Sequence, residues 1–223
     1  MSVASSIFAA PSAQALPSTA LAEVLRHPGV WRRSSGSSTT IRTQATGHVE
    51  LDALLPGGGW PLGALTEILI ENDGIGELEL VMPALVALTR ARRRIALIAP
   101  PYIPYPPALA AAGIDLDRIV RIDADAGDTH WSAEQCLRAG CCAAVLHWLP
   151  NVDYKQLRRL QLASESGDAL AFLFRPIGAA SQASPAALRV MVSASATASC
   201  VEILKCRGGM DTRRESRIAL RAS

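Results

Sequence analysis

The sequence lacks the cysteine and histidine patterns that identify disulfide-rich and zinc-binding proteins. Its five cysteines are odd in number and include no Cys-x-x-Cys pair, which argues against a disulfide framework. Its four histidines are scattered without the spacing of zinc ligands. We therefore expect a cytoplasmic protein with reduced cysteines and no metal or other cofactor.

Long apolar runs that are free of proline are also missing. Residues 95–114 carry no charge, but they contain five prolines, a density that a membrane helix does not tolerate. Residues 1–22 are uncharged too, yet they have no basic segment of the kind that opens a secretion signal. We expect no association with a membrane.

Lysine is scarce, and the net charge is small. Only two of the 22 basic residues are lysine, and the formal charge of +2 is too low for the whole chain to bind a polyanion. The charge is unevenly spread, because residues 51–206 are mildly acidic and both ends are rich in arginine. Arginine forms bidentate contacts with carboxylate or phosphate, so the C-terminal segment is a candidate surface for a partner. Its arginines are Arg207, Arg213, Arg214, Arg217 and Arg221.

Strands and helices are expected to alternate along most of the chain. Apolar runs predict strands at 66–71, 94–99, 118–122, 143–148 and 169–175, followed by an antiparallel pair at 188–194 and 200–206. Helical spacing predicts helices at 77–91, 106–112, 130–140 and 153–166, with Leu157, Leu160 and Leu162 of the last one facing inward. This alternation is typical of an α/β fold with a mostly parallel central sheet, helices on both faces and an antiparallel C-terminal edge.

The length of 223 residues and the 49% hydrophobic content suit one main domain. Residues 1–44 are expected to form a flexible segment with a short helix at 18–26, because a Ser/Thr/Gly-rich stretch separates that helix from the rest. Residues 45–207 then form the domain, and residues 208–223 form a basic tail.

One stretch is more specific than the others. Thr46-Gly47 and Leu51-Asp52 precede a glycine-rich turn at 57–59, which is followed by Pro61-Leu62-Gly63 and the first strand. This order resembles the start of a RecA-like core, and the resemblance extends over about residues 45–207. It implies a RecA-like α/β domain.

The resemblance places a phosphate-binding loop after the first strand, but its chemistry is lost here. Such a loop ends in Gly-Lys-Ser/Thr, so that backbone N–H groups and the lysine hold phosphate and the hydroxyl holds magnesium. Here Gly74 and Gly76 are followed by Glu77 and Leu78, which reverses the charge at the lysine position. Glu71, Asp73 and Glu77 would all face a triphosphate, so we expect neither nucleotide binding nor hydrolysis.

Two further catalytic positions also lack their carboxylates. His147 stands where the magnesium-binding aspartate is expected, and residues 99–102 offer no acid to activate water. On an apolar strand, His147 is expected to be a core residue. The sequence therefore predicts that the protein is not an enzyme.

Two related bacterial families of RecA-like proteins without a phosphate loop resemble this chain: ImuA and SulA. Both share Leu-Thr-Glu-Ile at 65–68, Leu-Arg-Ala-Gly at 137–140 and Ala-Phe-Leu-Phe-Arg-Pro at 171–176. The stretch from Leu51 to Gly63, and Val201-Glu-Ile-Leu-Lys-Cys-Arg-Gly-Gly near the C-terminus, look more like ImuA. SulA is shorter there and lacks a comparable last hairpin.

The ImuA resemblance implies an adaptor of SOS-induced translesion DNA synthesis. Such a protein acts with ImuB, a relative of the Y-family polymerases, and through it with an error-prone polymerase III alpha subunit. RecA is a further partner that the retained core suggests. Direct binding of single-stranded DNA is expected to be weak or absent, because residues 177–187 have no basic or aromatic side chain. The alternative is a SulA-like inhibitor of cell division that binds FtsZ.

Overall fold

A computed structural model describes residues 41–125, 127–194, 199–209 and 217–220. The strands are β1 Thr43–Gln44, β2 Trp60–Pro61, β3 Ala64–Ile70, β4 Ile95–Ile98, β5 Ile119–Ile122, β6 Ala144–Trp148, β7 Leu170–Pro176, β8 Leu188–Ala194, β9 Ser199–Cys206 and β10 Arg217–Leu220. The helices are α2 Val49–Leu54, α3 Glu77–Arg90, α4 Pro106–Ala111, α5 Thr129–Ala139 and α6 Tyr154–Glu165, with 3-10 turns η1 Leu116–Arg118 and η2 Ile177–Ser181. In these residues, no helix is long and apolar enough to cross a membrane.

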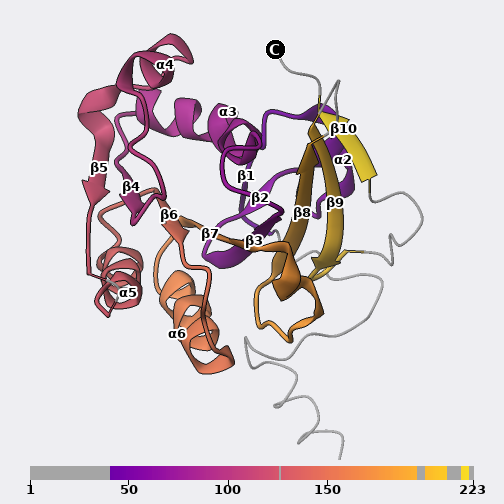
Figure 1. Cartoon of the computed structure of the whole chain (residues 1–223). Coiled ribbons are helices and arrows are strands. Elements are labelled where there is room, and N and C mark those ends of the chain that lie inside the picture. Colours follow the sequence, from indigo (N-terminus) through magenta and orange to yellow (C-terminus); the bar gives the residue numbers. More distant parts are fainter. Residues whose placement is uncertain (1–40, 126, 195–198, 210–216, 221–223) are drawn as a thin grey trace, which may run out of the picture. The chain divides into compact units, whose positions relative to one another are not determined.

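Eight strands form one sheet in the order β10-β9-β8-β3-β7-β6-β4-β5 (Figure 1). The strands from β8 to β5 run parallel, whereas β9 pairs antiparallel with both β8 and β10. The mostly parallel sheet with an antiparallel edge, predicted from the apolar runs, is therefore present. β3 lies inside the sheet between β7 and β8, and six of its seven residues are buried.

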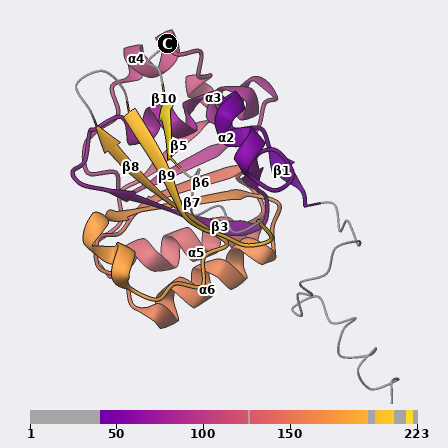
Figure 2. The same ribbon diagram turned by 90° about the vertical axis from the view of Figure 1, so that its right-hand side faces the viewer.

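Helices cover both faces of the sheet, as the alternating pattern predicts. Figure 2 shows α5 and α6 on one face and α2, α3 and α4 on the other. The alternation of side chains along each strand explains this, since Ile68 and Leu146 pack on the α2–α3 side while Leu65 and Val145 pack on the α5–α6 side. In α6, Leu157 and Leu160 are buried as expected. Leu162 is 44% exposed, which corrects the prediction that it faces inward.

The Thr-Gly and Leu-Asp pairs that precede the sheet have a local structural role. The backbone N–H of Thr46 donates to Oδ1 of Asp52 at 2.9 Å, and Leu51 of α2 is fully buried in the core. These contacts hold the start of the domain against the α3 face. Helix α2 was not predicted, because six residues are too few to show a clear helical period.

The folded part extends past both of the limits expected at 45 and 207. β1 lies before residue 45 and pairs with β2, and β10 lies within the predicted tail and pairs with β9. β1 and β2 are two residues long and β10 is four residues long. Strands this short do not show an alternating pattern in the sequence, so they were not predicted. The predicted helix at 18–26 lies outside the described residues.

Candidate functional site

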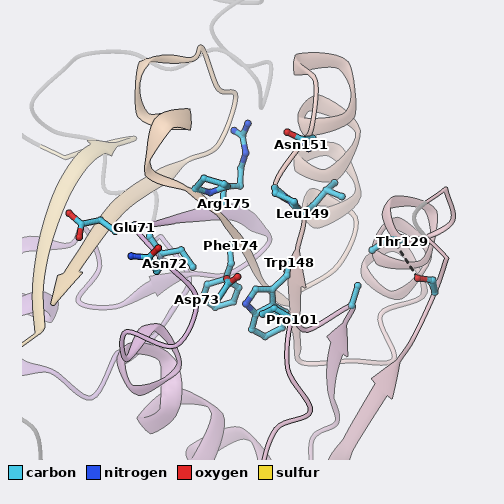
Figure 3. A pocket seen from close by; sticks show the side chains of 15 residues that line it. Glu71, Asn72, Asp73, Pro101, Thr129, Trp148, Leu149, Asn151, Phe174 and Arg175 are labelled. Carbon is cyan, nitrogen blue, oxygen red and sulfur yellow. Dashed lines mark hydrogen bonds between the residues drawn. The ribbon is translucent and has the colours of Figure 1, made fainter.

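The loops that follow the parallel strands meet at one edge of the sheet and enclose a cavity of about 670 Å³. A crevice outside the carboxyl ends of the strands is where ligands bind in open α/β sheets. Figure 3 shows Glu71, Asn72 and Asp73 on one side of this cavity and Thr129 on the other. The lining residues are Ile70, Glu71, Asn72, Asp73, Ala99, Pro101, Ala124, Thr129, Trp148, Leu149, Pro150, Asn151, Phe174, Arg175 and Pro176.

The loop between β3 and α3 is the segment compared above with a phosphate-binding loop. Gly74 and Gly76 have φ values of 85° and 99°, so both adopt the left-handed conformation that glycine allows. The carboxylate of Glu77 turns back into this loop and accepts the backbone N–H of Gly74, at 3.0 Å to Oε1 and 3.1 Å to Oε2. The N–H of Gly74 therefore already has an anionic acceptor from its own chain.

This geometry corrects part of the sequence-based interpretation. Glu71 and Asp73 line the cavity as expected, but Glu77 is only 5% exposed and does not line it. Leu78 packs against the apolar core of the α3 face. Partial burial, with a smaller effect from the nearby Glu77, raises the pKa of Asp73.

His147 lies in the core, as its place on an apolar strand predicts. Its side chain is 2% exposed, and within the described residues neither of its ring nitrogens has a hydrogen-bond partner. Burial, with a smaller effect from His130, lowers the pKa of His147 to about 3. His147 does not line the cavity. Among the described residues, no cluster of three His, Cys, Asp or Glu side chains is placed to hold a metal ion.

The next residue along β6 forms the aromatic part of the cavity. The Trp148 and Phe174 rings are stacked, with centroids 4.5 Å apart and planes 12° from parallel. The indole Nε1 of Trp148 is buried and has no hydrogen-bond partner among the described residues. A buried donor without a partner calls for an explanation, and Trp148 lines the cavity.

A buried ionic cluster lies behind the cavity, centred on Glu67 of β3. Glu67 is fully buried, and its Oε2 lies 3.5 Å from Nη1 of Arg175 and 3.1 Å from Nε of Arg189. Ser184 donates its hydroxyl to the other carboxylate oxygen. The arginines also hold the loop at 177–187, because Arg175 donates to Gln182 at 2.7 Å and Arg189 donates to the carbonyl of Ala179 at 2.8 Å.

The motifs Leu-Thr-Glu-Ile and Ala-Phe-Leu-Phe-Arg-Pro contain Glu67 and Arg175, whose role the sequence pattern does not predict. The structure joins the two motifs through this ion pair. The available signal was a single charged residue inside each of two apolar strands, since such charges are rarely buried unless they are paired. Burial lowers the pKa of Arg175, and Glu67 opposes that effect.

The predicted arginine surface is only partly within the described residues. Arg207 is exposed, and its Nη2 donates to the carbonyl of Pro185 at 3.1 Å, which ties it to the 177–187 loop. Arg217 opens β10 and pairs with Glu202 in the strand register. Arg213, Arg214 and Arg221 lie outside the described residues, so the five-arginine surface stays a prediction.

Comparison with known proteins gives one family. Residues 63–171, just under half of the chain, match the family model described as "Cell division inhibitor SulA". Curated proteins of that name are 38% identical over 69 residues in Photorhabdus laumondii and 25% identical over 115 residues in Serratia marcescens. These alignments cover 30% and 51% of this chain, and 39% and 68% of the two relatives. The central segment of the chain is therefore related to SulA.

A solved structure of SulA from Pseudomonas aeruginosa is 26% identical, with a TM-score of 0.42. The match covers 97% of that protein and 50% of this chain. The chain spans about two fifths of the length of the first two curated relatives, those of Photorhabdus laumondii and Edwardsiella piscicida. The family match begins just before β3 and ends in β7, so it includes the loops after β3, β4, β5 and β6 but not β8, β9 and β10.

Proposed function

We propose that this protein is a non-enzymatic inhibitor of cell division that acts, like SulA, by binding the tubulin-like division protein FtsZ. The observation that carries the proposal is the SulA match over residues 63–171. Curated homologues with the same name support it. The SulA-like function, which the sequence resemblance gave as the alternative to an ImuA-like adaptor, is thus the first candidate.

Two features of the site support action without catalysis. The acceptor for the Gly74 N–H is the protein's own Glu77, and the position of a magnesium-binding aspartate is occupied by the buried His147. A RecA-like core that has lost its nucleotide chemistry accounts for both features and for the position of the cavity after β3. We include this RecA-like origin in the proposal.

A protein partner fits the surface near the cavity. The loop between β4 and α4 exposes three large apolar residues. Tyr102 is 68% exposed, Ile103 71% and Tyr105 69%. Three large apolar side chains this exposed within four residues form a patch that water solvates poorly and a partner would cover. The loop lies inside the segment that matches SulA.

The test is capture of purified FtsZ from the source organism by the full chain. We expect the wild-type chain to retain FtsZ and the Tyr102→Ser/Tyr105→Ser variant to lose it. Val49→Ser is the matched control, because Val49 is 82% exposed but lies outside the SulA match. Equal capture of FtsZ by all three proteins would show that the loop is not part of the interface. Failure of the wild-type chain to capture FtsZ would contradict the proposed function.

An ImuA-like adaptor of translesion DNA synthesis is the second candidate. It is favoured by one observation: β8, β9 and β10 lie outside the SulA match and form a three-stranded edge in the region where the sequence looks more like ImuA. In this candidate the partners are ImuB, an error-prone polymerase III alpha subunit and RecA, and the segment from Arg207 to Arg221 contacts ImuB. Affinity capture from DNA-damaged cells of the source tests it. Recovery of an ImuB-like protein, lost on removal of residues 207–223, would support it, and recovery of FtsZ alone would exclude it.

A further inference from the structure

The cavity at the carboxyl edge of the sheet has a net negative lining. Glu71 and Asp73 both line it and are exposed, and in the described part of the chain neither has an ion-pair partner. Arg175 also lines the cavity, but its guanidinium is already engaged by Glu67, Gln182 and the carbonyl of Val152. The charge that remains open to a ligand is therefore negative, which repels phosphate and attracts a cation.

The aromatic part of the cavity adds a second preference. Trp148 and Phe174 line the cavity with 7% and 2% of their surface exposed, so the small open part of the Trp148 ring is the aromatic group that a cation could contact. A guanidinium group is planar and weakly hydrated, so it stacks on an aromatic face while its edge donates to carboxylates. A lysine ammonium group lacks this flat face and is more strongly hydrated.

Trp148 also supplies an independent sign that a ligand is expected. The residue is only 7% exposed, it lines the cavity, and its Nε1–H has no acceptor in the part of the chain that the structure describes. A cation does not satisfy this donor, whereas a peptide carbonyl does. A ligand that combines a guanidinium with a neighbouring carbonyl therefore fits both the carboxylates and the indole.

The size of the cavity agrees with such a ligand. Its volume of about 670 Å³ is in the range of pockets that enclose a small molecule or a few side chains. Partial burial, with a smaller effect from Glu77, raises the pKa of Asp73, and a cation bound beside Asp73 favours its charged form.

We propose that this cavity binds an arginine side chain presented by a peptide segment of a partner protein. The guanidinium lies beside the carboxylate of Asp73 and against the part of Trp148 that lines the cavity, and a carbonyl of the same segment accepts the Trp148 indole N–H; the carboxylate of Glu71, which Figure 3 shows turned away from Trp148, adds negative charge at the rim. At the place where a nucleotide-binding protein would bind anionic phosphate, this cavity would bind a cation. It goes beyond the proposed function, because it does not depend on which protein supplies the arginine.

The test uses the full chain and the peptide N-acetyl-Gly-Gly-Arg-Gly-Gly-amide, followed through the indole N–H resonances in two-dimensional NMR. A matched peptide carries citrulline, which keeps the shape of arginine but is uncharged. We expect the arginine peptide to shift the Trp148 resonance, which Trp148→Phe identifies, and the citrulline peptide to bind about tenfold more weakly or worse.

Variants separate the site from general attraction to an acidic surface. Glu71→Gln/Asp73→Asn is expected to weaken the arginine peptide by about tenfold, since it removes both carboxylates while keeping their shape. Glu50→Gln/Glu79→Gln removes two exposed acids that do not line the cavity, and it is expected to leave binding unchanged. Equal binding of the arginine and citrulline peptides, equal loss in both double variants, or no shift at Trp148 would overturn the proposal. Such a failure would leave FtsZ binding by the exposed Tyr102–Tyr105 loop untouched.

Discussion

The Glu77 carboxylate accepts the backbone N–H of Gly74 with both oxygens, at 3.0 and 3.1 Å. In a nucleotide-binding loop, the backbone N–H groups point at phosphate instead. Here the anion is covalently attached to the first residue of α3, where it also lies close to the positive end of the helix dipole. Glu77, the residue that follows Gly76 where a phosphate-binding loop would carry lysine, thus supplies the acceptor for this loop.

Replacing Glu77 by alanine is expected to lower the free energy of unfolding by about 1–2 kcal/mol, because it removes a charged hydrogen-bond acceptor and an acid in the first helical turn. Glu79→Ala, an exposed acid in the same turn, is the control and is expected to change stability by less than about 0.5 kcal/mol. Urea unfolding measures both. Equal stability of the two variants would show that the Glu77–Gly74 contact contributes nothing.

The buried cluster around Glu67 predicts a larger effect. Glu67→Ala leaves the buried guanidinium groups of Arg175 and Arg189 without their carboxylate, a change that costs about 3–5 kcal/mol in buried ion pairs. Asp168→Asn breaks the exposed pair between Arg42 and Asp168 and is expected to cost at most about 1 kcal/mol.

Thermal and urea unfolding of the two variants compare these costs. Proteolysis of the Glu67 variant is further expected to begin in the 177–187 loop, because Arg175, Arg189 and Ser184 hold that loop to Glu67. A Glu67→Ala protein as stable as Asp168→Asn would contradict the structural role assigned to the cluster.

His147 predicts a pH dependence of stability. Its pKa is about 3 in the folded protein and 6.5 in its ordinary state. Between these values the unfolded chain binds a proton that the folded chain does not, so this histidine makes stability fall as the pH drops below 6.5. His147→Leu is expected to lose less stability than the wild type between pH 7.5 and pH 5. Urea unfolding measures the free energy of unfolding of both proteins at the two pH values. If the difference between the proteins is the same at pH 7.5 and pH 5, His147 does not cause the pH dependence.

Cys136 predicts a pH-dependent reactivity. A hydrogen bond with Cys142 lowers the pKa of Cys136 from 9.0 to about 7, against the opposing effect of burial. The thiolate is the reactive form, so alkylation of Cys136 by iodoacetamide is expected to rise with a midpoint near pH 7. Peptide mapping by mass spectrometry follows this site separately from the exposed Cys141. In Cys142→Ala the midpoint moves upward, and an unchanged midpoint would rule out the hydrogen bond as the cause.

Most of the sheet could be predicted from the sequence, because its buried parallel strands are short apolar runs such as Ile95–Ile98 and Ala144–Trp148. The exceptions are strands too short to show a pattern of their own. β10 is a four-residue strand in a segment rich in charge, and only its register with β9 identifies it as part of the sheet. Local pattern carries no information about such a partner.

The sequence predicted where the candidate site lies, but it did not predict the contacts that its side chains make. The glycines at 74 and 76 predicted the loop, while the direction of the Glu77 side chain depends on the backbone that these glycines adopt. The link between Glu67 and Arg175 joins residues 108 positions apart, so it required the parallel register of β3 and β7.

We propose that the protein acts by binding FtsZ and not by catalysis. The most direct measurement is GTP-dependent assembly of purified FtsZ, followed by light scattering with increasing amounts of the full chain and no other nucleotide. We predict inhibition that saturates near one chain per FtsZ subunit and is lost in Tyr102→Ser/Tyr105→Ser but kept in Val49→Ser. Assembly that is unaffected by an excess of the folded wild-type chain would contradict the account and leave the ImuA-like adaptor as the candidate to test.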